Sequence, residues 1–449
     1  MRKLTSLLVP APLALFALFA CEQDSSSGGG ALPLVDASLA DYTPPPPFDA
    51  NAPETATDLP VTVTITGRDG PKASVRVVFH DAAGAILETK VTGADGKATS
   101  SGTPAMVSAL LELRGAREIV TWTGVEAGDQ LAIRDPGAQE PLGTLDVALP
   151  GPFGNAVEYV VKAGQCNALG DAEGASLTLY PRCVGGQAAV LAFALSSGGT
   201  VDGVAFAKGK SFPSDGGAAA VATGDWQVPG TFELTVLNPP ADAFLASELT
   251  EIVDGVGYSD PPQTGQGTTY SFKTAPGFAD AYQVSTGFSS ASTPRKVIKR
   301  LGPAATASLD AATLLPPITA TSLDATDPRR PVLGWTSPST AGADGGIVQI
   351  GYADALGGGA FWTFVVPPGS KSVTAPAMPA DVGGFLPGGA DVFYGGPRVL
   401  FIEADVLPSY ASFRRQPGSL VDVLGGTFEV PVVPVNGTFR LTGFIAQPG

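Results

Sequence analysis

Alternation of apolar and polar residues dominates the chain beyond Asp58. In residues 61–66 valine and isoleucine alternate with threonine, which places the aliphatic side chains on one face of a strand and the threonines on the other. Similar alternation follows in residues 73–80 and 87–92, and then comes Asp95-Gly96, a dipeptide suited to the positive φ angles of a tight hairpin. The pattern predicts an antiparallel sheet.

Short apolar runs between turns rich in glycine and proline continue toward the C-terminus, and this spacing predicts further sandwiches. The predicted strands are 157–161, 188–195, 201–206, 218–221, 232–236, 347–351, 361–366 and 399–404. Two segments stay open, because residues 106–113 and residues 241–253 each fit a short helix as well as a strand. The predicted fold class is all-β, with tandem antiparallel β-sandwiches.

The composition permits buried cores but limits the chemistry. Hydrophobic residues make up 44% of the 449, although glycine (57) and proline (41) are frequent. The 26 basic and 42 acidic side chains give a net charge of −16, which argues against a nucleic-acid partner because phosphate binding needs a basic face. One histidine and three cysteines leave almost no material for a zinc site or a histidine-based triad. No catalytic residue, metal ligand or cofactor is therefore assigned.

Residues 1–20 have the outline of an export signal. They begin with Met1-Arg2-Lys3, continue with an apolar stretch that Pro10 and Pro12 interrupt, and end before Cys21. The stretch is too short to span a bilayer well, since a membrane helix takes about 20 apolar residues. An ordinary secretory signal followed by a chance cysteine fits the same residues.

The segment Leu18-Phe19-Ala20-Cys21 resembles the lipobox of bacterial lipoproteins. The resemblance implies that Cys21 carries lipid, becomes the first mature residue and anchors the chain in the bacterial cell envelope, at the outer membrane. Because the chain is acidic, lipid rather than charge has to hold it there. Residues 21–57 are rich in serine, glycine and proline, cannot bury enough apolar surface to offset their ordering entropy, and are predicted to form a disordered tether.

The first folded segment carries a recognisable pattern of turn residues. It consists of Thr66-Gly67-Arg68-Asp69-Gly70-Pro71, then Ala73-Ser74-Val75, then Thr92-Gly93-Ala94-Asp95-Gly96-Lys97-Ala98. This pattern resembles the transthyretin-like, carboxypeptidase-regulatory-like β-sandwich of bacterial surface proteins. The resemblance implies such a sandwich over residues 58–144, with a role as spacer, folding aid or adhesive module.

The later segments are assigned more coarsely, as immunoglobulin-like sandwiches. Residues 145–312 are expected to form a second sandwich, from the spacing of their apolar runs. Pro331-Val332-Leu333-Gly334-Trp335 resembles the second strand of fibronectin type III-like sandwiches. That resemblance implies a third sandwich over residues 313–449, with Trp335 in its core.

Cys166 and Cys183 remain as a pair if Cys21 carries lipid. In an exported, oxidising setting a structural disulfide is expected between them. Closing a segment of this length is worth about 3 kcal/mol in the chain-entropy model.

Three isolated features offer little chemistry. His80 falls on the polar side of a predicted strand and is expected to be an exposed imidazole, with no nucleophile beside it. Gly209-Lys210-Ser211 lacks the spacing of a phosphate loop. Trp362 stays open between a core position and a surface stacking position.

Acidic residues are the remaining candidates for a site. The densest local set is Glu248, Glu251, Asp254 and Asp260. A glycosidase needs only two acids at the proper separation, while the simpler interpretation is the solvated face of a polar loop. Calcium ligands could gather at Asp254, Asp260, Asp324 and Asp327, although no EF-hand loop is present.

Two functions follow from these observations. The first is a non-enzymatic, lipid-anchored envelope protein that acts as a structural spacer or as a binding or adhesion module, with an envelope glycan or protein as partner. The second is an envelope glycan hydrolase with paired carboxylates. Two acids facing each other in a concave, aromatic-lined cleft would favour the hydrolase, whereas flat or convex sandwich faces would count against it.

Overall fold

The structure is a computed structural model of the 449-residue chain. It describes residues 59–67, 70–113, 116–134, 141–180, 183, 188–210, 218–241, 243–289, 293–354, 358–389, 392–415 and 436–444. These all belong to the second of two compact units, Ala37–Gly449. The predicted signal (1–20), the lipidation site Cys21 and the predicted tether (21–57) lie outside the described residues.

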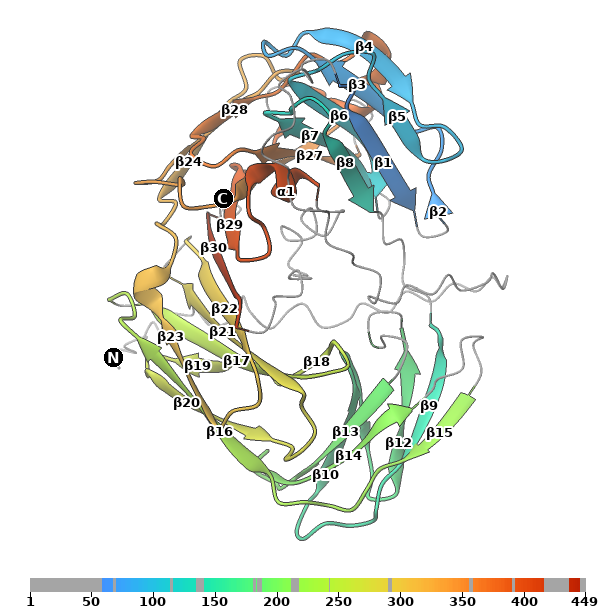
Figure 1. The fold of residues 1–449 in the computed structure, drawn as a ribbon, viewed down its shortest axis with the longest axis vertical. Coiled ribbons are helices and arrows are strands. Elements are labelled where there is room, and N and C mark those ends of the chain that lie inside the picture. Colours follow the sequence, from blue (N-terminus) through green and yellow to red (C-terminus); the bar gives the residue numbers. More distant parts are fainter. Residues whose placement is uncertain are drawn as a thin grey trace, which may run out of the picture. The chain divides into compact units, whose positions relative to one another are not determined.

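The described residues form β-sheets almost throughout, with one short α-helix, α1 (Tyr410–Arg414), and a few 3-10 turns (Figure 1). Most strand pairs are antiparallel, and the sheets stack as two-layered sandwiches. The predicted all-β class is therefore confirmed. Both open segments are strands rather than helices: residues 106–113 form β6 (Met106–Leu113), and β17 (Phe244–Val253) occupies most of 241–253.

The first segment is a sandwich of two four-stranded layers. β1 (Thr62–Gly67) pairs with β2 (Gly70–Pro71), β5 (Lys97–Thr99) and β8 (Gln130–Arg134). The opposing layer has the order β4 (Ile86–Val91), β3 (Arg76–His80), β6, β7 (Ala116–Thr123). Asp95-Gly96 does form a tight turn, with Gly96 at φ 73°, but the turn leads from one layer to the other because β4 and β5 belong to different sheets.

The second segment places the disulfide in its core. One layer is β12 (Gly174–Leu179), β9 (Gly143–Ala148) and β15 (Ala218–Ala222). The other is β11 (Cys166–Gly170), β10 (Glu158–Ala163), β13 (Ala188–Leu195) and β14 (Val201–Lys210). Cys166 and Cys183 are joined as expected, with their Cα atoms 5.4 Å apart, and both side chains are buried between the layers.

The third segment covers one face of a larger sheet. Its small layer is β20 (Thr269–Thr274), β16 (Gly230–Leu237) and β23 (Thr306–Asp310), which is followed by the turn η3 (Ala311–Thr313). Phe232, Leu234 and Phe272 from this layer pack against β17 and β21 (Ala281–Ser289). The other strands of the segment are β18 (Val256–Ser259), β19 (Gln263–Gly265) and β22 (Arg295–Leu301).

The fourth segment has β24 (Ala320–Asp324), β25 (Val332–Thr336) and β28 (Ser372–Thr374) as its small layer. Trp335 of β25 is buried against Phe401, as the resemblance implied. The remaining elements are β26 (Gly345–Ala353), β27 (Gly359–Val366), η4 (Ala380–Phe385), β29 (Arg398–Ala404), α1 and β30 (Thr438–Phe444).

The larger layers of the first, third and fourth segments join edge to edge into one central sheet. Its strand order is β18-β17-β21-β22-β30-β29-β26-β27-β7-β6-β3-β4, with β19 also paired to β17. The two joints are the antiparallel pair β22–β30 and the parallel pair β27–β7. Strand pairing therefore crosses the expected limit between residues 312 and 313. The expected limits 58–144, 145–312 and 313–449 stay predictions.

In three segments, the strand that begins the segment and the strand that ends it form a parallel pair. These closing pairs are β1 with β8, β9 with β15, and β16 with β23. Two of these closing pairs, β9–β15 and β16–β23, fall in the range 145–312 that was expected to form one sandwich, apart from the first two residues of β9.

Polar side chains form a buried chain across the β27–β7 joint. His80 Nε2 lies 3.1 Å from Ser108 Oγ, Ser108 Oγ lies 2.8 Å from Thr121 Oγ1, and Trp362 Nε1 donates to Thr121 Oγ1 at 2.9 Å. The expectation of an exposed His80 was wrong: the residue is fully buried, and burial lowers its pKa to about 4. Alternation predicts a solvated face only where nothing covers that face, and here the fourth segment covers it. Trp362 is likewise a core residue.

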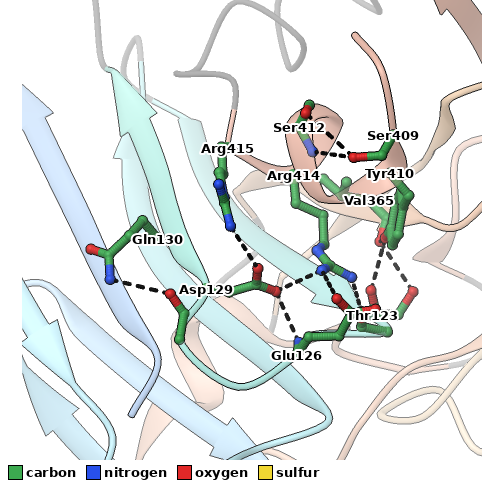
Figure 2. Close-up of polar contacts among 12 residues, drawn as sticks. Thr123, Glu126, Asp129, Gln130, Val365, Ser409, Tyr410, Ser412, Arg414 and Arg415 are labelled. Carbon is green, nitrogen blue, oxygen red and sulfur yellow. Dashed lines mark hydrogen bonds and ion pairs between the residues drawn. The ribbon is translucent and has the colours of Figure 1, made fainter. Parts of the chain in front are cut away.

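A buried arginine ties α1 to the turn between β7 and β8 (Figure 2). Arg414 Nη2 lies 2.8 Å from Asp129 Oδ2, the guanidinium stacks over the Tyr410 ring with 4.6 Å to its centroid, and Nη1 donates to the Gly124 carbonyl. Arg414 and Asp129 are 1% and 2% exposed, so the two charges compensate each other away from water. We call this set the Arg414 cluster.

We expect Arg414→Ala to lower the free energy of unfolding by about 3–5 kcal/mol, because it removes the buried cation that compensates the buried Asp129 carboxylate. Arg415→Ala is the matched control: that side chain is 50% exposed and 3.9 Å from Asp129, so we expect its loss to cost less than about 1 kcal/mol. Urea unfolding of Asp129→Ala, Arg414→Ala and Asp129→Ala/Arg414→Ala measures the coupling between the two residues, and Arg415→Ala is compared with them. Equal effects of Arg414→Ala and Arg415→Ala would contradict the cluster.

Candidate functional site

A groove lies between the larger layer of the second segment and the central sheet. It encloses about 1160 Å³. Residues of β10, β11, β13 and β14 line one side, and residues of β17, β18, β19, β21, β22 and the small-layer strand β20 line the other. Lys162 spans the two sides, because its Nζ donates to Ser259 O at 2.8 Å and pairs with Asp260 Oδ1 at 2.5 Å. The same ammonium group is 5.1 Å from the centroid of the Phe193 ring.

The floor of the groove is a row of polar side chains on four neighbouring strands. In the strand register Ser259 faces Thr250, Thr250 faces Gln283, and Gln283 faces Arg300. All four residues line the groove. Directly opposed residues on paired strands have their Cβ atoms about 4.5–5.5 Å apart, so the row is continuous. We call these residues the floor row.

Positive charge prevails along the groove. The lining contains Lys162, Lys273, Lys296 and Arg300, against Glu248 and Asp260. This excess contrasts with the net charge of −16 on the whole chain. Lys162 is paired with Asp260, and the other basic lining residues lie on β20 and β22.

The four clustered acids of the sequence do not converge. Glu248 lines the groove and accepts a hydrogen bond from Ser285 Oγ at 3.4 Å, whereas Glu251 lies on the opposite face of β17 because successive side chains of a strand alternate. Asp254 occupies the first position of a two-residue Asp-Gly hairpin turn between β17 and β18, with φ 50°. Asp260 is engaged by Lys162. Only Glu248 and Asp260 of the four therefore line the groove.

Glu251 is a buried acid in the core of the third segment. It is 4% exposed, and Ala275 N donates to its Oε1 at 3.2 Å. Burial raises the pKa of the Glu251 carboxyl to about 8; the Ala275 hydrogen bond and the charge of Lys162 oppose that shift, and the charge of Asp260 adds to it. The carboxyl is thus protonated at pH 7, and it faces Tyr282 rather than the groove.

The acids considered for calcium serve local turns. Asp324 Oδ1 accepts from Thr326 N and Oγ1 at 3.0 and 2.7 Å, and Asp327 Oδ1 accepts from Arg329 N at 3.0 Å. Within the ranges that the structure describes, three or more potential metal-ligating side chains nowhere gather at one point. Lys210 ends strand β14, and Ser211 of the rejected phosphate-loop pattern lies outside the described residues.

The cations of the groove were missed in the sequence, although a signal for them was present. Residues 295–300 carry four of the 26 basic side chains of the chain within six positions. Alternation along β22 turns Lys296 and Arg300 toward the groove, and Arg295 and Lys299 the other way.

Comparisons with known proteins identify no family. No family model matches the chain, and no curated protein matches it. Among solved structures, the TIE protein of Bacillus anthracis is 13% identical with TM-score 0.15, covering 52% of this chain and 46% of its own. A streptococcal ancillary pilin is 7% identical with TM-score 0.13, covering 56% of this chain and 98% of its own. An adhesin-like protein of Bacteroides ovatus is 10% identical with TM-score 0.14, covering 33% of this chain and 78% of its own.

The chain spans about half the length of the TIE protein. TM-scores this far below 0.5 do not indicate a shared overall arrangement, so the all-β class rests on the strand pairing of this chain. Within the described ranges, no helix has the length and apolarity that crossing a bilayer requires.

Glu251 makes stability depend on pH. Between pH 4.5 and about 8 the folded chain keeps a proton on Glu251 that the unfolded chain has released, so the folded state loses stability as pH rises, by at most about 1.4 kcal/mol per pH unit. We expect Glu251→Gln to reduce the fall in the urea midpoint between pH 5 and 8. Glu248→Gln, on the other face of β17, is the control and should keep that fall; identical profiles for both variants would refute the assignment.

Proposed function

We propose that the protein is a non-enzymatic binding or adhesion module of the bacterial cell envelope, held there by lipid on Cys21. The observation that carries the binding role is the groove, because it presents a continuous row of hydrogen-bonding side chains beside several cations. A structural spacer alone requires no such surface. The envelope location is supported by the resemblance of residues 18–21 to a lipobox and by the disulfide, which belongs to an oxidising compartment.

Hydrolysis of an envelope glycan is the second candidate, favoured by one observation. Glu248 and Asp260 line the same groove, and a hydrolase needs one protonated and one ionised carboxyl group there. Asp260, however, is ion-paired with Lys162, which engages the carboxylate that would have to act on a substrate. A glycan cleft is expected to expose aromatic rings. The rings among the described lining residues are Phe193 and Phe272, and each is only 3% exposed, so neither presents a face for stacking. Binding therefore accounts for the groove better than turnover does.

Lipid attachment is tested by labelling. We expect the full chain expressed in a bacterium to incorporate labelled palmitate and to fractionate with membranes, and Cys21→Ser to lose the label and leave the membrane fraction. Cys166→Ser/Cys183→Ser is the control, since those residues form the disulfide, and it should keep the label. Mass spectrometry that found an intact Met1 or an unmodified Cys21 thiol would refute the anchor.

The binding role is tested with envelopes isolated from the source bacterium. We expect the purified full chain to bind them without releasing reducing sugar ends, and Gln283→Ala/Arg300→Ala to weaken binding at least about tenfold by removing two floor contacts. Release of reducing ends by the unaltered chain, abolished by Glu248→Gln, would establish the hydrolase instead. Failure of the unaltered chain to bind would overturn the proposed function.

A further inference from the structure

The two borders of the central sheet end it in different ways. At one border the chain forms β18 and β19, which are four and three residues long and are separated by a segment that contains Pro261-Pro262. Short strands and prolines are common ways of blunting a sheet edge. At the other border lies β4, which has six residues without proline or glycine and pairs only with β3 among the described strands (Figure 1). We call this border the β4 edge.

Main-chain groups of β4 point to this edge. Thr92, directly after β4, donates its N–H to the Val75 carbonyl and accepts from the Ser74 N–H, both at 2.9 Å, so its main chain faces the segment that leads into β3. Successive residues of a strand direct their N–H and C=O groups to opposite sides. The groups of Thr89 and Val91 therefore point away from β3, where a further strand can accept and donate hydrogen bonds.

The charged side chains of β4 are directed to the opposing layer. Lys90 Nζ donates to Ser101 Oγ at 3.0 Å, and Ser101 Oγ lies 2.8 Å from Glu88 Oε2, so both charges are engaged beside the end of β5. Leu87 and Val91 are the most exposed apolar side chains of the strand, at 56% and 59%. Exposed aliphatic side chains beside unpaired main-chain groups favour the addition of a strand.

The sequence of β4 is complementary to itself when two copies run antiparallel. If Thr89 faces Thr89 of a second copy, Leu87 faces Val91. The same register sets Glu88 against Lys90, so opposite charges meet while both keep their contacts with the opposing layer. A shift by one residue sets Leu87 against Lys90 or Glu88 against Val91, and a shift by two sets like charges together. The pattern thus favours one register and a second copy over an unrelated strand.

We propose that β4 pairs with β4 of a second copy of this chain, antiparallel and centred on Thr89, so that two central sheets join into one. Such a contact is isologous and closes as a two-fold dimer. The inference goes beyond the proposed function, since it requires neither the groove nor the lipid. A six-residue edge buries less surface than a standard interface, so we expect a dissociation constant of about 10–100 μM.

Sedimentation velocity of the full chain with Cys21→Ser, which carries no lipid, measures the dimer. We expect the dimer fraction to rise with concentration between about 1 and 500 μM. Leu87→Lys/Val91→Lys sets like charges across the joint and should raise the dissociation constant at least about tenfold. Leu87→Lys/Val91→Glu should restore it to within about threefold of the unaltered chain, because the register then sets opposite charges together.

The matched control is Val157→Lys/Val228→Lys, which changes two valines that are exposed even more than Val91 and lie outside β4. It should leave the dissociation constant within about twofold, and surface changes of this kind should leave the urea midpoint of every variant nearly unchanged. A chain that stays monomeric at about 500 μM would overturn the proposal. Equal dissociation constants for Leu87→Lys/Val91→Lys and Leu87→Lys/Val91→Glu, or for Leu87→Lys/Val91→Lys and the control, would overturn it as well.

Discussion

Unpaired strand edges are the constraint on which the rest of this structure depends. A sandwich leaves N–H and C=O groups exposed at the border of each layer, and such borders tend to pair with other chains. Here three segments use one another instead: β22 pairs with β30, and β27 pairs with β7. The side chains at the second joint match as well, because Trp362 donates to Thr121 and Thr363 donates to Glu118 across it. Buried polar contacts of this kind favour one partner strand and one register.

The groove follows from this joining. By extending the central sheet through β22, β21 and β17, the chain obtains a broad face with polar positions in register, and the second segment stands over that face through Lys162 and Tyr258. The buried contact of Tyr258 with the Ala189 carbonyl and the ion pair of Lys162 with Asp260 fix the two walls by polar contacts. An acidic chain thus carries several basic side chains along one groove, two of them from the basic segment 295–300.

The sequence predicts features that depend on local patterns, and it does not predict those that depend on pairing between distant segments. Strands such as 188–195 and 232–236 were predicted because their apolar runs and turns are local signals, and they coincide with β13 and lie within β16. The Cys166–Cys183 pair followed from counting cysteines. Residues 106–113 stayed open because Leu110 and Leu111 are buried on opposite faces of β6, which removes the alternation that marks a strand. The burial of His80 and the gathering of Lys273 with Arg300 depend on segments far apart in the chain, and no local pattern encodes such pairing.

The parallel closing pairs carry a mechanical consequence. Because the first and last strands of a segment run side by side in the same direction, the chain enters at one end of the pair and leaves at the other. Tension along the polypeptide then slides the two strands past each other, and all the backbone hydrogen bonds between them share the load instead of opening in turn. Segments closed in this way resist being pulled apart, a property that suits the proposed role of a lipid-anchored binding module.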